Sequence, residues 1–178
     1  FSEYWFADEF GRNILNSMSP DAIYIPYTDH ASFPLIYLQN IEGIRKDITI
    51  GRLYGYLSPE LFEGMEKTQW DKYAPFPKKR YEDELIGWLI DNTDKPIYSE
   101  RKVKVISKGH GKWVPAGILY RYQRENEEVQ PSESYWQKYT WKYVKEENIK
   151  DLSSALIWLQ IQWAKARIVL KKMKMKWQ

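Results

Sequence analysis

The chain has 178 residues, of which 43% are hydrophobic and 29% are charged, as is usual for one soluble globular domain. This composition excludes a disordered chain and a collagen-like one, and no apolar run approaches the roughly 18 residues that a membrane-spanning helix needs. The absence of cysteine excludes disulfides, thiolate zinc sites and cysteine nucleophiles. The formal net charge of +3 is too small to favour nucleic acid as a partner.

The sequence offers little for a metal ion or a cofactor. Its two histidines, His30 and His110, are few for an imidazole metal site. Gly109-His110-Gly111 lacks the further glycine and the Lys-Ser/Thr pair of phosphate-binding loops, and a hairpin turn explains it better. We therefore expect neither a metal ion nor a cofactor.

Helical and strand-like segments alternate in the first part of the chain. Apolar residues at steps of three and four predict helices at 2–17 and 33–44, and apolar or β-branched runs predict strands at 22–25 and 48–50. Pro34 suits the first turn of the second helix. The order strand, helix, strand predicts a βαβ unit, in which the two strands are parallel neighbours and the helix covers one face of the sheet.

The middle of the chain continues this alternation. The sequence predicts a short helix at 58–65, a loop at 67–79 that is rich in proline and basic residues, and an amphipathic helix at 82–91. Three further strands are expected, with the turn at Gly109-His110-Gly111 between the last two: 96–99, 103–106 and 118–122.

A polar, acidic linker at 124–134 leads into a helical part, with helices expected at 135–145 and from 152 to the end. The predicted fold class is α/β: a small, mostly parallel sheet with flanking helices, followed by a C-terminal helical pair. The predicted domains are an α/β domain at 1–125 and a C-terminal helical extension at 126–178.

The last predicted helix combines an apolar seam with positive charge. From residue 152 onward there are six Lys or Arg residues and no acid. We expect the seam to pack on the rest of the chain as far as Leu170, and the segment from Lys171 to Trp177 to project toward other parts of a larger protein or an anionic membrane surface. Alternating steps of four and three residues define the seam: Leu152, Leu156, Leu159, Trp163, Ala166, Leu170, Met173 and Trp177.

One polar pair stands directly after the first predicted strand, where α/β folds place ligand groups. Asp29 and His30 have the chemistry of an acid/base pair. Adjacent residues on a turn usually point different ways, and no nucleophile stands beside these two, so we favour a capping role for Asp29 at the following helix. We predict no catalytic residues in the chain.

Aromatic residues make up 16% of the chain, with nine Trp and fourteen Tyr. Most are expected in the core or between helices, because Trp and Tyr bury a large area. The densest groups, at 72–81 and 135–143, lie among basic residues. Such rings stack on bases, stack on sugars or lie at a membrane interface.

The stretch at 12–57, RNILNSMSPDAIYIPYTDHASFPLIYLQNIEGIRKDITIGRLYGYL, resembles the soluble C-terminal part of the DUF2723 family. These are multi-spanning membrane proteins related to protein O-mannosyltransferases. The segments at 95–98 and 114–121 resemble two later strands of that family, whereas His30 and the segment at 52–55 depart from its pattern. The matching residues in the first stretch are Leu15, Asn16, Ser17, Pro20, Ala22, Ile23, Asp29, Phe33, Pro34, Leu35, Tyr37, Gln39, Glu42, Arg45 and Asp47.

The resemblance implies an extracytoplasmic, periplasmic domain that lies beside an active site on the membrane-embedded part of the same polypeptide. The chain begins at Phe1 without a signal-peptide pattern, and we expect it to be a piece of a larger protein. We expect Arg45 and Asp47, with Glu42 or Asp29, to act mainly as structural ties at a helix end. The candidate ligand-binding residues are six of the matching residues together with His30, which follows Asp29: Asp29, His30, Tyr37, Gln39, Glu42, Arg45 and Asp47.

Our leading hypothesis is a non-catalytic domain of a membrane-bound glycosyltransferase-like protein, which positions a glycan or protein acceptor. The alternative is a stand-alone carbohydrate- or nucleic-acid-binding module that uses exposed aromatic rings. An isolated enzyme ranks third. A binding module needs several coplanar exposed rings in one groove, and an enzyme needs clustered polar groups with perturbed pKa values in a pocket.

Overall fold

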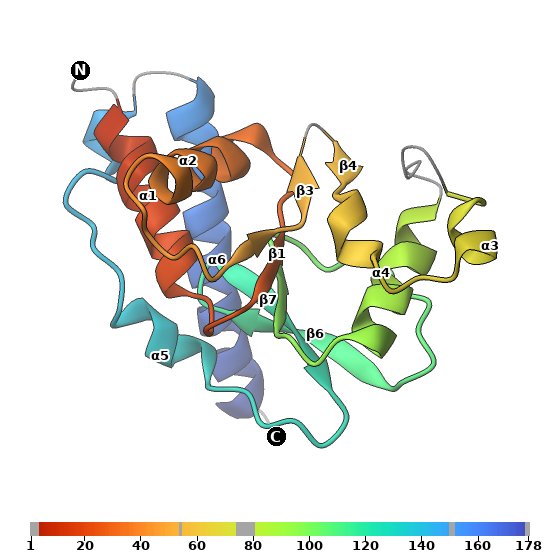
Figure 1. Ribbon diagram of the computed structural model, residues 1–178. Helices are drawn as coiled ribbons and strands as arrows, with labels where there is room; N and C mark the ends of the chain where they lie inside the picture. Colours follow the sequence, from red (N-terminus) through yellow and green to blue (C-terminus); the bar gives the residue numbers. More distant parts are fainter. Residues whose placement is uncertain (1–3, 54, 74–80, 150–151, 177–178) are drawn as a thin grey trace.

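The computed structural model describes residues 4–53, 55–73, 81–149 and 152–176 of the chain. Its centre is a five-stranded sheet in the order β2-β1-β5-β7-β6. Three helices, α1 (Tyr4–Asn16), α2 (Asp29–Asn40) and α6 (Leu152–Lys176), lie on one side of this sheet, and α4 (Glu82–Asn92) lies on the other (Figure 1). The predicted α/β class, with a mostly parallel sheet core and flanking helices, is confirmed.

The predicted βαβ unit is confirmed. β1 (Ile23–Ile25) pairs in parallel with β2 (Thr49–Ile50) and, on its other side, with β5 (Ile97–Ser99). α2 connects β1 to β2 but begins and ends four residues earlier than the predicted range. Pro34 therefore lies inside the helix rather than in its first turn, because the turn already closes through N–H bonds from Ala31 and Ser32 to the Thr28 carbonyl.

The other half of the sheet is antiparallel. β7 (Leu119–Arg124) pairs with β5 and with β6 (Gly111–Ala116), and Gly117 with φ +61° makes the turn between β6 and β7. The predicted turn at Gly109-His110-Gly111 is therefore misplaced, because Gly111 opens β6. The later segment that resembles a single DUF2723 strand forms this hairpin.

The strand predicted at 103–106 does not form, because this segment covers α4 instead of joining the sheet. The Ile106 N–H donates to the Asp83 carbonyl at 3.0 Å. A Cβ on Gly87 would lie 1.8 Å from the Ile106 carbonyl oxygen, so only glycine permits this close approach. The indole N–H of Trp113 donates to the Val103 carbonyl at 2.8 Å and holds the segment from the sheet side.

Alternate residues of β1 face two different cores. Tyr24 points into the core under α1, α2 and α6, whereas Ile23 and Ile25 point into the core under α4. The second core also receives residues from β4 (Tyr56–Leu57), which pairs with β3 (Arg52–Leu53), and from the 3-10 helix η1 (Pro59–Phe62). A sheet covered on both faces explains the uninterrupted apolar runs that predicted parallel strands.

Two shorter segments also differ from the prediction. The helix expected at 58–65 is reduced to η1, and the loop expected at 67–79 contains the helical turn α3 (Lys67–Trp70). The last part of that loop, at 74–79, lies outside the described residues.

The helix expected at 135–145 is wrong. Helix α5 (Ser132–Trp136) is short, and the following segment bends across α1 before the 3-10 turn η3 (Glu146–Asn148). The buried carboxylate of Glu9 accepts the backbone N–H groups of Lys142, Tyr143 and Val144 at 2.6–2.8 Å. These donors are thereby satisfied outside a helix, and the predicted C-terminal helical pair becomes one short and one long helix. Both contribute to the core under α1 and α2.

The predicted packing of the α6 seam is also wrong over the described side chains. Ile157, Ile161 and Ala164 form the buried face. By contrast, Leu156 is 41% exposed, Leu159 53% and Trp163 73%. The helix is rotated about its axis relative to the predicted orientation, because Trp158 packs on the core. The Lys165 ammonium also lies 5.4–6.0 Å from the rings of three tryptophans: Trp136, Trp141 and Trp158. The seam positions from Leu170 onward lie outside the described side chains.

No helix within the described ranges is both long and apolar enough to cross a lipid bilayer.

Candidate functional site

The carboxyl ends of β1 and β5 form the natural place for a site. From the carboxyl end of β1 the chain continues into α2 on one face, and from the carboxyl end of β5 it continues into the segment at 103–106, which packs with α4 on the opposite face. Two neighbouring parallel strands whose connections leave in opposite directions define a topological switch point, where α/β sheets bind ligands. Asp29 and His30 were predicted at this edge because they follow β1, and the structure places them there at the start of α2.

Glu100, the residue directly after β5, joins the two strand ends. Its Oε1 accepts the backbone N–H groups of Tyr27 at 3.0 Å and Thr28 at 3.3 Å, and its Oε2 accepts the Thr28 hydroxyl at 2.8 Å. The Tyr24 hydroxyl donates to Oε1 at 3.1 Å, and burial together with Glu100 raises the pKa of Tyr24 well above its ordinary value. A carboxylate of the chain itself thus occupies the backbone donors at the switch point.

A second group of charges surrounds the ring of Tyr27. The guanidinium carbon of Arg101 lies 3.8 Å from the ring centroid, and that of Arg52 lies 4.4 Å from it. Arg52 donates through Nη1 to Glu82 at 2.9 Å, with both side chains about nine-tenths buried. The Tyr27 hydroxyl donates to the same carboxylate, and its pKa is raised by burial and by Glu82. These contacts join the end of β1, β3 and the first turn of α4.

His30 turns toward α6 rather than toward Asp29. Its Nε2 lies 3.2 Å from the Thr28 hydroxyl and 3.3 Å from Oε1 of Gln160 on α6. Asp29 is exposed in the first turn of α2, and Thr28 holds the N-cap position. The capping role predicted for Asp29 is therefore wrong, although a carboxylate in this turn still complements the helix dipole.

The other motif residues lie at the opposite end of α2, before β2. Arg45 donates to both carboxylate oxygens of Asp47 at 2.9 Å. It also donates to three carbonyls at the end of α1 at 2.7–3.1 Å: those of Leu15, Met18 and Ser19. Gln39 donates to the carbonyls of Arg45 and Ile48, and Glu42 accepts from Arg12. These are the contacts that the structural-tie interpretation requires.

Six of the seven candidate residues therefore lie in two groups at opposite ends of α2, whose twelve residues span about 18 Å, and the seventh, Tyr37, lies on the helix between them. Asp29 and His30 lie at the carboxyl ends of the strands. Gln39, Glu42, Arg45 and Asp47 lie at the amino end of β2 and bind the chain itself.

Between these groups, the outer face of α2 exposes one stripe of side chains. Asp29, Phe33, Tyr37 and Ile41 are spaced four residues apart, and Phe33 is 50% exposed, Tyr37 53%. We call these four residues the α2 outer face. It begins at the switch point and presents a carboxylate, two aromatic rings and an aliphatic group on successive turns.

Three important residues of this region were missed in the sequence: Tyr27, Arg52 and Glu100. Glu100 was detectable, because it follows a predicted strand just as Asp29 does. Within the described ranges, no group of three His, Asp or Glu side chains is arranged to hold a metal ion.

We expect Arg45→Ala to lower the free energy of unfolding by about 2–3 kcal/mol, because three carbonyls and Asp47 lose a charged donor. The bond from Arg45 lowers the pKa of Asp47 below its usual 3.8. The contribution of the pair is therefore present above that pH and is lost as the pH falls through the lowered value. Urea unfolding of both proteins at pH 7 and near pH 3 should show a smaller difference at the lower pH. Unchanged stability with loss of ligand binding would instead make Arg45 a ligand residue.

The order of the strands and the helices on both faces of the sheet define a three-layer α/β domain. The charged residues at its strand ends chiefly form hydrogen bonds and ion pairs between elements of the domain itself. The chain matches the family model described as TMEM260-associated domain 2 over residues 7–175, and it belongs to this family. No curated protein and no solved structure matches the chain.

Proposed function

We propose that this chain is a non-catalytic extracytoplasmic domain of a membrane-bound glycosyltransferase-like protein, in which it positions the glycan or the acceptor. The DUF2723 resemblance of residues 12–57 supports the membrane-bound parent and the periplasmic location as parts of this proposal. In this arrangement the membrane-embedded part of the same polypeptide supplies the active site.

The α2 outer face is the observation that carries the proposal. Aromatic rings such as Phe33 and Tyr37 present flat apolar surfaces that match the C–H faces of a sugar. The exposed carboxylate of Asp29, two turns before Tyr37, accepts hydrogen bonds from hydroxyl groups. The stripe starts at the edge of the sheet where α/β folds bind ligands.

The strand-end charges support a scaffold rather than a reaction centre. Glu100 accepts four hydrogen bonds from the chain, and Glu82 is held by Arg52 and Tyr27. Groups bound in this way position the start of α2 and thereby the stripe that follows.

The stand-alone module is the weaker hypothesis on the geometry. It requires several coplanar rings in one groove, whereas the other strongly exposed rings among the described side chains lie on three separate elements: Trp5 on α1, Tyr56 on β4 and Trp163 on α6.

Amide NMR of the isotopically labelled chain, titrated with methyl α-mannoside and α-linked mannose oligosaccharides, tests the proposal. We expect saturable shifts at residues 29–41 with a dissociation constant on the order of millimolar, as suits a weak positioning contact. A single-stranded oligonucleotide serves as the control and should leave these amides unchanged. Saccharide shifts centred on other elements, or none at all, would contradict the proposal.

A further inference from the structure

α6 carries an apolar stripe on the side that faces away from the protein. Leu156, Leu159 and Trp163 follow one another at steps of three and four residues and are all exposed. We call these three residues the α6 outer face. Because Ile157 and Ile161 on the opposite side are fully buried, the helix is apolar on both sides here, a pattern typical of helices covered on both sides.

The charge of the same helix restricts what covers it. Six of the 27 Lys and Arg residues, and none of the 24 acidic residues, lie at 152–178, which gives this segment +6. The remaining 21 basic residues stand against 24 acidic ones, a net −3. A second copy of the chain docked through this face would bring two strongly positive helices together, which is unfavourable. A partner that combines negative charge with an apolar surface matches both the charge of the segment and its apolar stripe.

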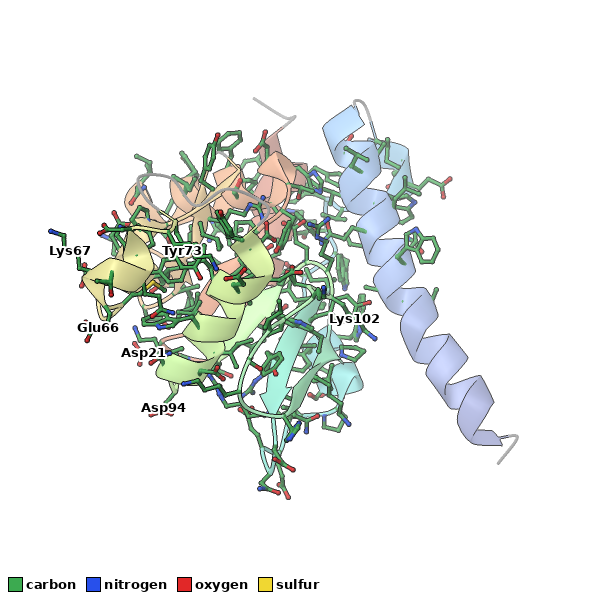
Figure 2. The ribbon with its side chains drawn as sticks, turned by 90° about the vertical axis from the view of Figure 1, so that its right-hand side faces the viewer. Asp21, Glu66, Lys67, Tyr73, Asp94 and Lys102 are labelled. Carbon is green, nitrogen blue, oxygen red and sulfur yellow. The ribbon has the colours of Figure 1, made fainter. Side chains whose placement is uncertain are left out.

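The position of α6 allows contact with a flat surface. Figure 2 shows α6 along one side of the body, with its last turns clear of the rest of the ribbon. Its 25 residues give a rod about 37 Å long. Lys165 is held near the Trp136 and Trp141 rings of the body. The other five basic residues of the segment, Arg167 and four lysines, follow it in the sequence, so most of the positive charge belongs to the C-terminal part of the helix.

We infer that α6 lies in the plane of an anionic bilayer surface, with Leu156, Leu159 and Trp163 among the lipid headgroups and the lysines beside the anionic ones. Tryptophan and leucine on one side of a basic helix are typical of interfacial helices. The inference rests on the proposed function only for the presence of a bilayer beside the domain. It names a contact that sets the orientation of the domain, whereas the α2 outer face is assigned to the glycan.

Co-sedimentation of the 178-residue chain with vesicles tests the inference. The vesicles are phosphatidylcholine alone, or phosphatidylcholine with about one lipid in three replaced by phosphatidylserine. We expect binding to the anionic vesicles that weakens as salt is raised. Each lysine replaced by glutamine among Lys171, Lys172, Lys174 and Lys176 should weaken binding by about fivefold.

The apolar stripe is tested by Trp163→Gln and Leu159→Gln, with Trp5→Gln as the matched control on α1. We expect the first two to weaken binding to anionic vesicles tenfold or more, and the control to bind as the unaltered chain does. Circular dichroism and urea unfolding verify that the variants are folded, as expected for exposed side chains.

Three outcomes would overturn the inference. One is no binding, or equal and salt-independent binding to both vesicles. Another is binding that depends on the lysines but not on Trp163 or Leu159. The last is a concentration-dependent dimer in sedimentation velocity that Trp163→Gln abolishes, which would assign the face to a second copy. None of these results bears on saccharide shifts at residues 29–41, so failure here is distinguishable from failure of the proposed function.

Discussion

Glu9→Gln is expected to lower the free energy of unfolding by about 3 kcal/mol or more, because a buried carboxylate that accepts three backbone N–H groups is replaced by a side chain with one acceptor. The side-chain NH2 group of glutamine would also point at backbone N–H groups, so that hydrogen-bond donors would face each other. Asn13 holds the neighbouring part of the same segment through the N–H and carbonyl of Thr140, at 3.0 and 2.7 Å. Glu9 and Asn13 together therefore fasten residues 140–144 to α1.

Urea unfolding and amide hydrogen exchange measure this effect. In Glu9→Gln, the amides of residues 142–144 should lose their protection before those of the sheet do. Asp8→Asn is the matched control, because Asp8 pairs with Arg12 on the surface of the same helix and such pairs contribute at most about 1 kcal/mol. Equal losses in the two variants, or retained protection at 142–144, would refute the fastening role.

The largest charge effect is expected at Arg52. Arg52→Met should destabilise the fold by about 3–5 kcal/mol, because the buried Glu82 side chain would lose the cation that pairs with it. The double variant Arg52→Met, Glu82→Met should recover much of this loss, because it removes both charges and leaves two packed apolar side chains.

A double-mutant cycle by urea unfolding gives the interaction free energy directly. Tyr27→Phe measures the hydroxyl contact with Glu82 separately and should cost about 1 kcal/mol. Strictly additive single variants would show that Arg52 and Glu82 do not stabilise each other.

Local sequence patterns were sufficient to predict the core of the sheet. The isoleucine-rich runs in β1 and β2, with a helix between them, predicted parallel pairing because both faces of those strands are apolar. The same patterns failed where a distant partner decides the conformation. The segment at 135–145 has helical spacing, yet Glu9, more than 130 positions away, takes its backbone donors. On α6, two apolar stripes compete, and the tryptophans around Lys165 decide which one faces the core.

The residues of the candidate site were likewise predictable from the sequence only in part. The rule that ligand groups follow parallel strands located Asp29 and His30, and the same rule applied to β5 would have found Glu100. The contacts of Glu82 could not be read from the sequence, because Arg52 and Tyr27 lie 30 and 55 positions away. The motif containing Arg45 and Asp47 was compatible with ligand binding and with structural ties. Only the structure shows that Arg45 contacts three carbonyls at and just after the end of α1.

The most direct test of the proposed function compares two tyrosines of almost equal exposure in the saccharide titration. Tyr37 on the α2 outer face is 53% exposed, and Tyr56 on β4 is 49% exposed. Tyr37→Ala should weaken mannoside binding about fivefold, because a stacked ring contributes on the order of 1 kcal/mol, whereas Tyr56→Ala should bind as the unaltered chain does. Equal binding by the two variants and the unaltered chain, or a loss confined to Tyr56→Ala, would contradict the assignment of glycan positioning to α2.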